Sequence, residues 1–380
     1  MADIEAVLKK KTEEGLLRIL KPISCRHAGK ITIDKKSYID FSSNDYLGLS
    51  QHPKLILVSQ KAIVEFGTSS SASRLLSGDL ELHHRLEESL AAFKNKEAAL
   101  VFNSGYQANT GIIPALYRKG DCIFLDRLAH ASLIDGINLS GARSFRFRHN
   151  DMEHLESLLK KERVNFRKAL IVTESIFSMD GDKASLKDIA ALKSKYNCEI
   201  FLDEAHATGI FGKNGSGLAE EEGVTEKTDF IMGTFSKALG SFGAYLATSR
   251  KIADYLVNTC RSFIYSTALP PGAIAANLSS IELVKAEPER REKILKLSEY
   301  FRASLAKGGF QVKGCSQIVP LMVGDNLRAV ELAKKLQSAG FWVLPILPPT
   351  VPKGEARLRF CLTYNHEKED IDKLVKECSK

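Results

Sequence analysis

From about residue 98 to residue 250, short apolar runs alternate with amphipathic stretches. The apolar runs have strand length, and most are separated by segments with helical periodicity, such as "NDMEHLESLLKKE". Strands that are apolar throughout and joined by helices are typical of a mostly parallel sheet covered on both faces. We therefore predict an α/β fold, with a large domain built on a mostly parallel seven-stranded sheet between helices. The seven runs are "AALVF", "DCIFLD", "SFRFR", "KALIVTESIF", "CEIFLD", "DFIMGTF" and "GAYLATS".

The rest of the chain follows other patterns. Residues 1–20 predict one amphipathic helix, and "KITI" and "SYIDF" predict two short strands. After "YSTALPP" (265–271) the alternation stops, residues 273–309 predict one long helix, and shorter strands and helices of an α+β domain follow. These changes divide the chain into three expected parts. They are an N-terminal helix with short strands (1–45), a large α/β domain (46–270) and a smaller C-terminal α+β domain (271–380).

Composition narrows the class of protein only slightly. Lys and Arg number 54 against 46 Asp and Glu, a net charge of +8 that fits phosphates, coenzyme A or nucleic acid, and equally fits solubility alone. Seven cysteines without a Cys-x-x-Cys argue against a disulfide framework and a zinc ribbon, and suit a reducing compartment. No stretch resembles a signal peptide or a membrane span. We expect a cytoplasmic protein that binds no metal and no membrane.

Residues 203–206 read Asp-Glu-Ala-His, the box with which RNA helicases hold Mg²⁺ and ATP. A helicase also needs a Gly-x-x-x-x-Gly-Lys-[Ser/Thr] loop to hold the phosphates. The Gly-Lys pairs at 29–30 and 212–213 are followed by neither Ser nor Thr. We therefore reject the helicase interpretation, and with it a nucleic-acid partner, which leaves Asp203 and His206 available for other chemistry.

Polar residues recur where the predicted strands end. In open parallel sheets, ligands bind beyond the carboxyl ends of the strands. We therefore expect these residues to line one cleft. They are the Asn103-Ser104-Gly105 segment, His130, Ser178, Asp203, His206 and Thr234.

Lys237 lies among apolar and small residues in "GTFSKALGSFGAY". Burying an ammonium ion is costly, so such surroundings favour a neutral amine that can form a Schiff base. The alternative is a solvated lysine in a turn between strands. A pyridoxal 5'-phosphate (PLP) site needs a lysine, a carboxylate against the pyridine nitrogen and a phosphate cup at a helix start. Lys237, Asp203 and residues 103–109 provide these three parts, so we predict a PLP site.

With these motifs in place, the chain resembles the α-oxoamine synthases, fold-type-I PLP enzymes that join an amino acid to an acyl-CoA with loss of CO₂. The similarity runs over nearly the whole chain. It is carried by the ordered blocks "FSSNDYLGLS", "NSGYQAN", "DRLAHASLIDG", "FRHND", "TESIFSMDGD", "LDEAHATGIFG", "TFSKALG", "YSTALPP" and "LPPTVPKGEARLRF".

Within that family, "YSTALPP", "VGDN" and "PPTVPKG" are most similar to the biotin-pathway branch, which condenses L-alanine with a pimeloyl thioester. One stretch departs from that branch: "TSSSASR" (68–74) stands where a glycine-rich segment is common, which bears on the amino-acid and acyl preference. The alternatives are 2-amino-3-ketobutyrate CoA ligase, which uses glycine and acetyl-CoA, and a non-catalytic scaffold with the same fold. The presence of Lys237 disfavours the scaffold.

The resemblance implies a role for each of the strand-end residues. Lys237 would bind the cofactor covalently and move the α-proton of the substrate. Asp203 would pair with the pyridine nitrogen, and His206 would reach the phenolic oxygen with Ser178 nearby. His130 would stack on the ring and contact the substrate.

The resemblance also implies how the phosphate is held. Gly105 and Tyr106 would offer backbone amides, and Thr234 would offer its hydroxyl. Ser266 and Thr267 would reach the phosphate from a second subunit, which implies a homodimer with active sites at the subunit interface. A simpler alternative is that Ser266 and Thr267 cap a turn.

Three further stretches are implied to bind substrate. Alternation in "ARLRFCL" puts Arg357 and Arg359 on one face, where both could simply be solvated charges on an edge strand. The resemblance selects Arg359 as the clamp for the amino-acid carboxylate, because a planar guanidinium matches a carboxylate, with Asn44 assisting. Arg18 and Thr350 would contact the acyl substrate, although Arg18 could equally lie on a helix surface.

Overall fold

The structure is a computed structural model that describes residues 4–380. The chain groups into two compact units. We call Leu49–Phe177 together with Lys183–Arg291 the larger unit. The smaller unit comprises the N-terminal residues as far as Gly48, Ser178–Asp182 and Glu292–Lys380.

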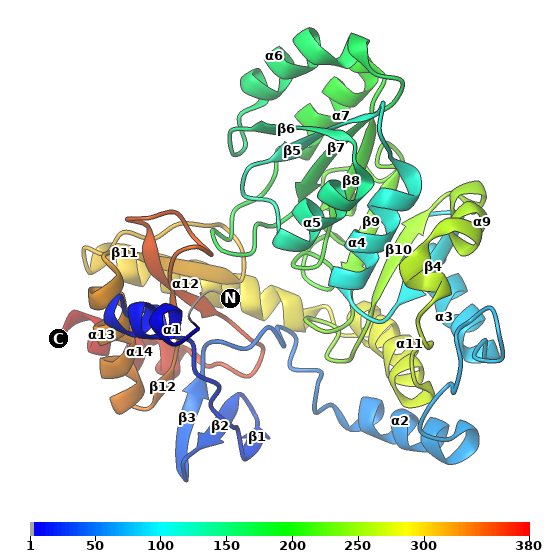
Figure 1. Cartoon of the computed structure of the whole chain (residues 1–380). Helices are drawn as coiled ribbons and strands as arrows, with labels where there is room; N and C mark the ends of the chain where they lie inside the picture. The colour runs from blue at the N-terminus through cyan, green and yellow to red at the C-terminus, as the bar shows by residue number, and fades with distance from the viewer. Residues whose placement is uncertain (1–3) are drawn as a thin grey trace. The chain divides into compact units, whose positions relative to one another are not determined.

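The larger unit is built on a seven-stranded sheet with the order β4-β10-β9-β8-β7-β5-β6. β10 is antiparallel to both of its neighbours, and the other neighbouring strands pair in parallel (Figure 1). The predicted α/β fold with a mostly parallel sheet is therefore confirmed. The strands are β4 (Ala98–Phe102), β5 (Cys122–Asp126), β6 (Arg143–Phe147), β7 (Ala169–Glu174), β8 (Glu199–Asp203), β9 (Phe230–Thr234) and β10 (Ala244–Thr248).

Helices cover this sheet because its strands are apolar on both faces. Every residue of β4, β5, β7, β9 and β10 is buried, although successive side chains point to opposite faces. On one face, the apolar side chains form a continuous core with α4, α5 and α9. The helices of this unit are α2 (Pro53–Phe66), α3 (Glu81–Phe93), α4 (Gly105–Leu116), α5 (Ala131–Ser140), α6 (Met152–Glu162), the 3₁₀ turn η1 (Arg163–Asn165), α7 (Leu186–Tyr196), α8 (Leu218–Glu221), α9 (Arg250–Thr259), α10 (Arg261–Ile264) and α11 (Pro271–Ala286).

The smaller unit joins both ends of the chain. A sheet of order β1-β2-β3-β12 pairs the N-terminal strands with a C-terminal one, because β3 lies parallel to β12. A second sheet has the order β11-β14-β13, so that β14 is its central strand. Its elements are α1 (Ile4–Glu13), β1 (Cys25–His27), β2 (Lys30–Ile33), β3 (Lys36–Asp40), most of α12 (Glu289–Lys307), β11 (Ile318–Gly324), α13 (Asn326–Ser338), β12 (Phe341–Trp342), β13 (Pro345–Ile346), β14 (Ala356–Cys361) and α14 (Lys368–Ser379).

Two predicted helices are shorter than expected. The helix predicted over 1–20, whose first three residues lie outside the described chain, ends at Glu13 and is followed by Gly15 with a φ of 67°. A positive φ is left-handed backbone, which ends a right-handed helix. The long helix predicted over 273–309 is two helices, because Pro288 disfavours helical backbone at Glu287. Glu287 has φ −121° and ψ 61°.

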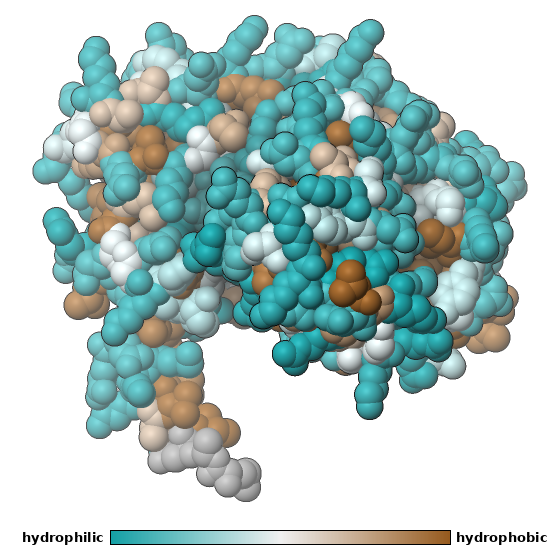
Figure 2. Space-filling view, turned by 90° about the horizontal axis from the view of Figure 1, so that it is seen from above, coloured by the Kyte–Doolittle hydropathy of each residue, from teal (hydrophilic) through white to brown (hydrophobic). Residues whose placement is uncertain are grey.

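The face of the molecule in Figure 2 is mainly hydrophilic. On the face in Figure 2, hydrophobic residues form small separate areas between hydrophilic side chains. Within residues 4–380, no helix combines the length and apolar character that crossing a membrane requires. The three-part domain division predicted from the sequence stays a prediction.

Candidate active site

A cavity of about 140 Å³ lies in the larger unit, where strands β7, β8 and β9 end. Of the residues predicted at the ends of successive strands, Gly105, His130, Asp203, His206 and Thr234 line this cavity, whereas Asn103, Ser104 and Ser178 do not. Parallel strands bring their carboxyl ends to one edge of the sheet, which explains why residues distant in sequence share this cavity. Its lining consists of Gly105, Tyr106, Asn109, His130, Ser132, Glu174, Asp203, Ala205, His206, Met232, Thr234, Ser236 and Lys237.

The turn between β9 and β10 positions Lys237. Its backbone is closed by hydrogen bonds from Phe235 N to Gly243 O (2.9 Å) and from Gly240 N to Lys237 O (2.9 Å). Gly240 has a φ of 63°, and a Cβ there would lie 2.5 Å from the backbone of Leu49. Only glycine fits both the conformation and the space, so the turn that carries the lysine has a fixed path.

Asp203 ends β8 with both carboxylate oxygens engaged. Oδ1 accepts from Ala205 N (2.9 Å), and Oδ2 accepts from Asn109 Nδ2 (3.1 Å). An ionised carboxylate accepts hydrogen bonds and donates none, so both contacts stabilise its charged form. The negative charge of Asp203 is therefore held at the cavity wall.

The next residue, Glu204, serves a different purpose. Its carboxylate accepts from Lys94 Nζ at 2.7 Å, and both side chains are 1% exposed. Thr208 Oγ1 lies 3.0 Å from the same ammonium. Burial alone would lower the pKa of Lys94, but the charges and hydrogen bonds of Glu204 and Tyr245 together outweigh burial and raise it. Of the Asp-Glu-Ala-His box, Asp203 and His206 line the cavity, whereas Glu204 belongs to a buried ion pair.

His130 precedes α5 as its N-cap residue. Its Nδ1 lies 2.7 Å from Ser132 Oγ and accepts from Ser132 N at 3.3 Å. Burial lowers the pKa of His130, which the nearby charge of Asp203 only partly opposes. The imidazole is therefore neutral near pH 7.

The lining fits an anionic group beside a ring. Thr234 is 5% exposed, and its hydroxyl has no hydrogen-bond partner among residues 4–380. Gly105 begins α4, and a Cβ at this position would lie 2.9 Å from Thr234 Cγ2. A helix start with free backbone N–H groups, a glycine that leaves space and an unused hydroxyl make a typical phosphate site. Together with Asp203 they suit the expected phosphorylated cofactor.

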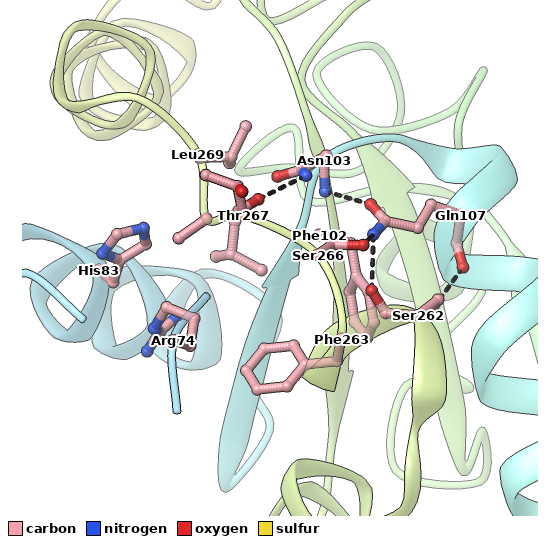
Figure 3. A pocket seen from close by; sticks show the side chains of 12 residues that line it. Arg74, His83, Phe102, Asn103, Gln107, Ser262, Phe263, Ser266, Thr267 and Leu269 are labelled. Atoms are coloured by element: carbon pink, nitrogen blue, oxygen red, sulfur yellow. Dashed lines mark hydrogen bonds between the residues drawn. The ribbon is translucent and has the colours of Figure 1, made fainter. Parts of the chain in front are cut away.

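Ser266 and Thr267 lie elsewhere in the chain, at a separate cavity of about 20 Å³ (Figure 3). Gln107 Nε2 donates to Ser266 Oγ at 2.6 Å, and Asn103 Nδ2 donates to the Thr267 carbonyl at 2.8 Å. These contacts tie the segment to the start of α4, beside Gly105. Within one chain, neither residue lines the cavity that contains Lys237.

In the smaller unit, the structure brings Arg359 together with Asn44 and Ser178. Arg359 donates to the Ser178 carbonyl (2.5 Å), to Asn44 Oδ1 (3.2 Å) and to Tyr46 Oη (3.4 Å). Its neighbour on the strand face, Arg357, is fully buried and pairs with the carboxylate of Asp180 at 2.9 Å. The expectation that both could be solvated edge charges is wrong, because β14 is the central strand of its sheet.

Arg18 and Thr350 also meet in the smaller unit. Arg18 Nη2 donates to Thr350 Oγ1 at 3.1 Å, although the two residues lie far apart in sequence. Arg18 follows the end of α1 and lies in a segment without regular structure, so the alternative of a helix-surface position is wrong.

Some lining residues were not recognised in the sequence, namely Asn109, Ser132 and Glu174. Asn109 lies one helical turn after Gly105 and Ser132 lies two residues after His130, so proximity along the chain could have indicated both. Glu174 is 2% exposed at the end of β7 and reads in sequence as part of an apolar strand.

The comparisons with known proteins agree with this geometry. The profile of the family "Aminotransferase class I and II" matches residues 36–377. An 8-amino-7-oxononanoate synthase from Geotalea daltonii is 46% identical over 364 residues, which cover 95% of this chain and 93% of that one. The chain belongs to the class I and II aminotransferase family, and within it to the 8-amino-7-oxononanoate synthases.

Solved structures have the same fold. Serine palmitoyltransferase from Sphingomonas wittichii superposes with a TM-score of 0.94 and 32% identity, covering 99% of this chain and 96% of that one. The 8-amino-7-oxononanoate synthase from Francisella tularensis gives a TM-score of 0.79 and 29% identity, covering 90% and 97%. SPT with PLP as the internal aldimine gives 0.93 and 30%, covering 100% and 96%. The predicted family and the fold-type-I architecture are thus confirmed.

Proposed function

We propose that the chain is a PLP-dependent acyltransferase that condenses L-alanine with a pimeloyl thioester in biotin biosynthesis. A carbon–carbon bond forms between the α-carbon of alanine and the thioester carbonyl carbon, and the carbon–sulfur bond breaks. The thiol and CO₂ leave, and the product is 8-amino-7-oxononanoate. One observation carries this proposal: Lys237, Asp203 and the unused Thr234 hydroxyl line a single cavity, in a chain similar to named synthases over 95% of its length.

PLP would supply an electron sink that stabilises negative charge on the α-carbon of the amino acid. Lys237 would hold it covalently and afterwards carry the α-proton. Asp203 would keep the pyridine nitrogen protonated, because a fixed negative charge favours the protonated ring. His206 would contact the phenolic oxygen. The start of α4 and Thr234 would bind the phosphate.

His130 would pack against the ring and contact the substrate. Its neutral imidazole presents a flat face without adding a positive charge beside Lys237. Arg359 would bind the amino-acid carboxylate, because a planar guanidinium matches a carboxylate and its Ser178, Asn44 and Tyr46 partners hold it in place. We extend the proposal to Arg18 and Thr350 as contacts for the acyl group.

We further propose that the chain works as a homodimer. Ser266 and Thr267 line a cavity other than that of Lys237 within one chain, so a phosphate contact from them requires a second copy. α2 also leaves apolar side chains in solvent, including Ile56, Leu57 and Val64, the last 89% exposed. An exposed apolar helix face is typical of a surface covered by another chain. Sedimentation at a series of concentrations tests this assembly.

A substrate panel tests the reaction. Purified protein with PLP is given alanine and pimeloyl-CoA, glycine and acetyl-CoA, or serine and palmitoyl-CoA, and released thiol and product mass are measured. We expect turnover with the first pair and the mass of 8-amino-7-oxononanoate. Preference for the second pair would assign the chain as a 2-amino-3-ketobutyrate CoA ligase, and the "TSSSASR" segment (68–74) would be the first place to seek the cause.

The same panel tests the scaffold alternative. A scaffold would turn over none of the three pairs, even with PLP added. Lys237→Ala provides the matched inactive control, because it removes the proposed covalent link and leaves the rest of the cavity in place. Turnover by the wild type but not by Lys237→Ala would exclude the scaffold.

A further inference from the structure

A chain of hydrogen bonds connects His130 to Asp203. His130 Nδ1 lies 2.7 Å from Ser132 Oγ, Ser132 Oγ lies 2.9 Å from Asn109 Nδ2, and Asn109 Nδ2 lies 3.1 Å from Asp203 Oδ2. The four residues come from three elements, since Asn109 belongs to α4, Ser132 to α5 and Asp203 to β8. All four line the same cavity.

The chemistry of the groups fixes the direction of each bond. The Asp203 carboxylate only accepts, so the amide of Asn109 must present its NH₂ group to it. The same NH₂ group donates its second hydrogen to Ser132 Oγ. His130 Nδ1 accepts a hydrogen bond from Ser132 N at 3.3 Å, so it carries no proton, and the hydrogen of the Ser132 hydroxyl is directed to it. His130 is therefore neutral, with its proton on Nε2.

Because the side chains of Asn109 and Ser132 are buried, breaking their hydrogen bonds would be energetically unfavourable. Asn109 and Ser132 are each 1% exposed, so water does not replace a lost partner. The Asn109 Oδ1 atom has no partner among residues 4–380, and turning the amide to satisfy it would set an oxygen against the Asp203 carboxylate. The amide is thus held in one orientation by its neighbours, while its own oxygen stays unpaired beside the cavity.

We propose that Asn109 and Ser132 are positioning residues, which hold His130 in the Nε2–H tautomer and the Asp203 carboxylate in one orientation. The inference rests on the proposed function in one respect, namely that His130 and Asp203 contact PLP. Asn109 and Ser132 then act on the cofactor through these two residues. The Asn109 amide bonds both to Ser132, which leads to His130, and to Asp203. A change at Asn109 therefore disturbs His130 and Asp203 together, whereas a change at Ser132 directly disturbs only His130.

The test uses purified holoenzyme and four variants. Ser132→Ala removes the link to His130, Asn109→Ala removes both links, and Ser132→Thr restores the hydroxyl. Ser140→Ala, on the same helix α5, is the matched control, because the Ser140 hydroxyl bonds only locally, donating to the Ile137 carbonyl. The absorbance of bound PLP is recorded against pH without substrate, and kcat and KM for L-alanine are measured with pimeloyl-CoA.

We expect the midpoint of the absorbance titration to shift in Ser132→Ala and further in Asn109→Ala. We expect kcat to fall about tenfold or more, because the reacting groups lose their orientation, with little change in KM. Ser132→Thr recovers most of the wild-type midpoint, and Ser140→Ala matches the wild type. Circular dichroism checks folding, and if Asn109→Ala does not fold, Ser132→Ala with its threonine rescue carries the same test.

Unchanged midpoints in Ser132→Ala and Asn109→Ala would overturn the inference, as would an equal shift in Ser140→Ala. These outcomes are distinct from failure of the proposed function. If the wild type binds PLP but prefers another amino acid or acyl thioester, the titration without substrate still decides the roles of Asn109 and Ser132. If the wild type binds no PLP, the proposed function fails and this inference fails with it.

Discussion

The cavity that contains Lys237 and the buried Lys94–Glu204 ion pair differ in whether their polar groups have hydrogen-bond partners. In the cavity, the Thr234 hydroxyl and the Asn109 carbonyl oxygen have no partner among residues 4–380. In the ion pair, Lys94 is bonded to Glu204 and Thr208. Buried polar groups are almost always hydrogen-bonded, so unpaired ones gathered in one place mark where a ligand completes the structure. Fully paired groups, in contrast, hold the scaffold together.

The largest expected effect is on catalysis, from the cavity itself. Lys237→Ala is expected to lower kcat by about 10³-fold or more, because it removes both the covalent link and the proton-transfer group. Product formation followed by mass spectrometry measures this loss. Lys187→Ala, an exposed lysine on α7, is the control and is expected to match the wild type. Activity within tenfold of the wild type in Lys237→Ala would rule out its role.

Breaking the ion pair is expected to affect stability. Lys94→Met leaves Glu204 buried without its cation, at a cost of about 3–5 kcal/mol in the free energy of unfolding. Chemical denaturation measures it. The double variant Lys94→Met/Glu204→Leu is expected to recover part of the loss, since no unpaired charge remains buried. A single variant as stable as the wild type would show that the pair does not hold the scaffold.

Two buried histidines, one in each unit, are expected to make the stability of the protein depend on pH. Burial lowers the pKa of His83 in the larger unit and of His366 in the smaller one from 6.5 to about 4. Between these values the unfolded chain binds protons that the folded chain does not, so stability falls as the pH drops from 6.5 towards 4, by about 3 kcal/mol for each fully effective site.

Urea unfolding at pH 7 and pH 4.5 measures this loss. His366→Gln is expected to lose less stability on acidification than the wild type, and His83→Gln likewise. His27→Gln, at an exposed histidine, is expected to lose as much as the wild type. Equal losses in all three variants would show that other groups cause the acid sensitivity.

The smallest expected effect distinguishes the roles of Arg357 and Arg359, which lie on the same strand, β14. Arg359→Lys replaces a bidentate donor with a point charge, and we expect KM for alanine to rise about 10-fold or more, in keeping with ~1.5–3 kcal/mol for a charged hydrogen bond. Arg357→Lys weakens the pair with Asp180 and is expected to lower thermal stability while leaving KM unchanged. Steady-state kinetics and melting curves compare the two, and matching KM values would contradict their separate roles.

The strands and the cavity could be predicted because each depends on local pattern. Fully buried strands such as β5 and β7 are apolar throughout, and the polar residues that follow them project to one edge by the geometry of parallel sheets. His130 and Asp203 were found in this way, and Lys237 was found by its apolar and small neighbours in the sequence. Their neighbours Asn109 and Ser132 were not found, because an amide and a hydroxyl on a helix resemble ordinary capping or surface residues, and only their closeness in sequence to Gly105 and His130 indicates them.

Two other features could not be predicted from the sequence, for physical reasons. The break at Glu287 depends on a single Pro288 within an otherwise helical stretch, and periodicity alone does not register it. The burial of Arg357 depends on β14 lying between β11 and β13, which is a property of strand order and not of the strand's own residues. Pairing partners distant in sequence therefore decide whether a charge is exposed.

The antiparallel direction of β10 has a consequence for where the chain can tolerate inserted or deleted residues. Parallel neighbours need a long crossover that can absorb extra residues, whereas antiparallel neighbours are joined by a short turn. Lys237 lies in such a turn, with Thr234 directly opposite Ala244 on the two flanking strands. An inserted or deleted residue between 235 and 243 would therefore change the position of the Lys237 amine, because this short turn cannot absorb the change as a long loop can, and we expect this segment to tolerate length variation poorly.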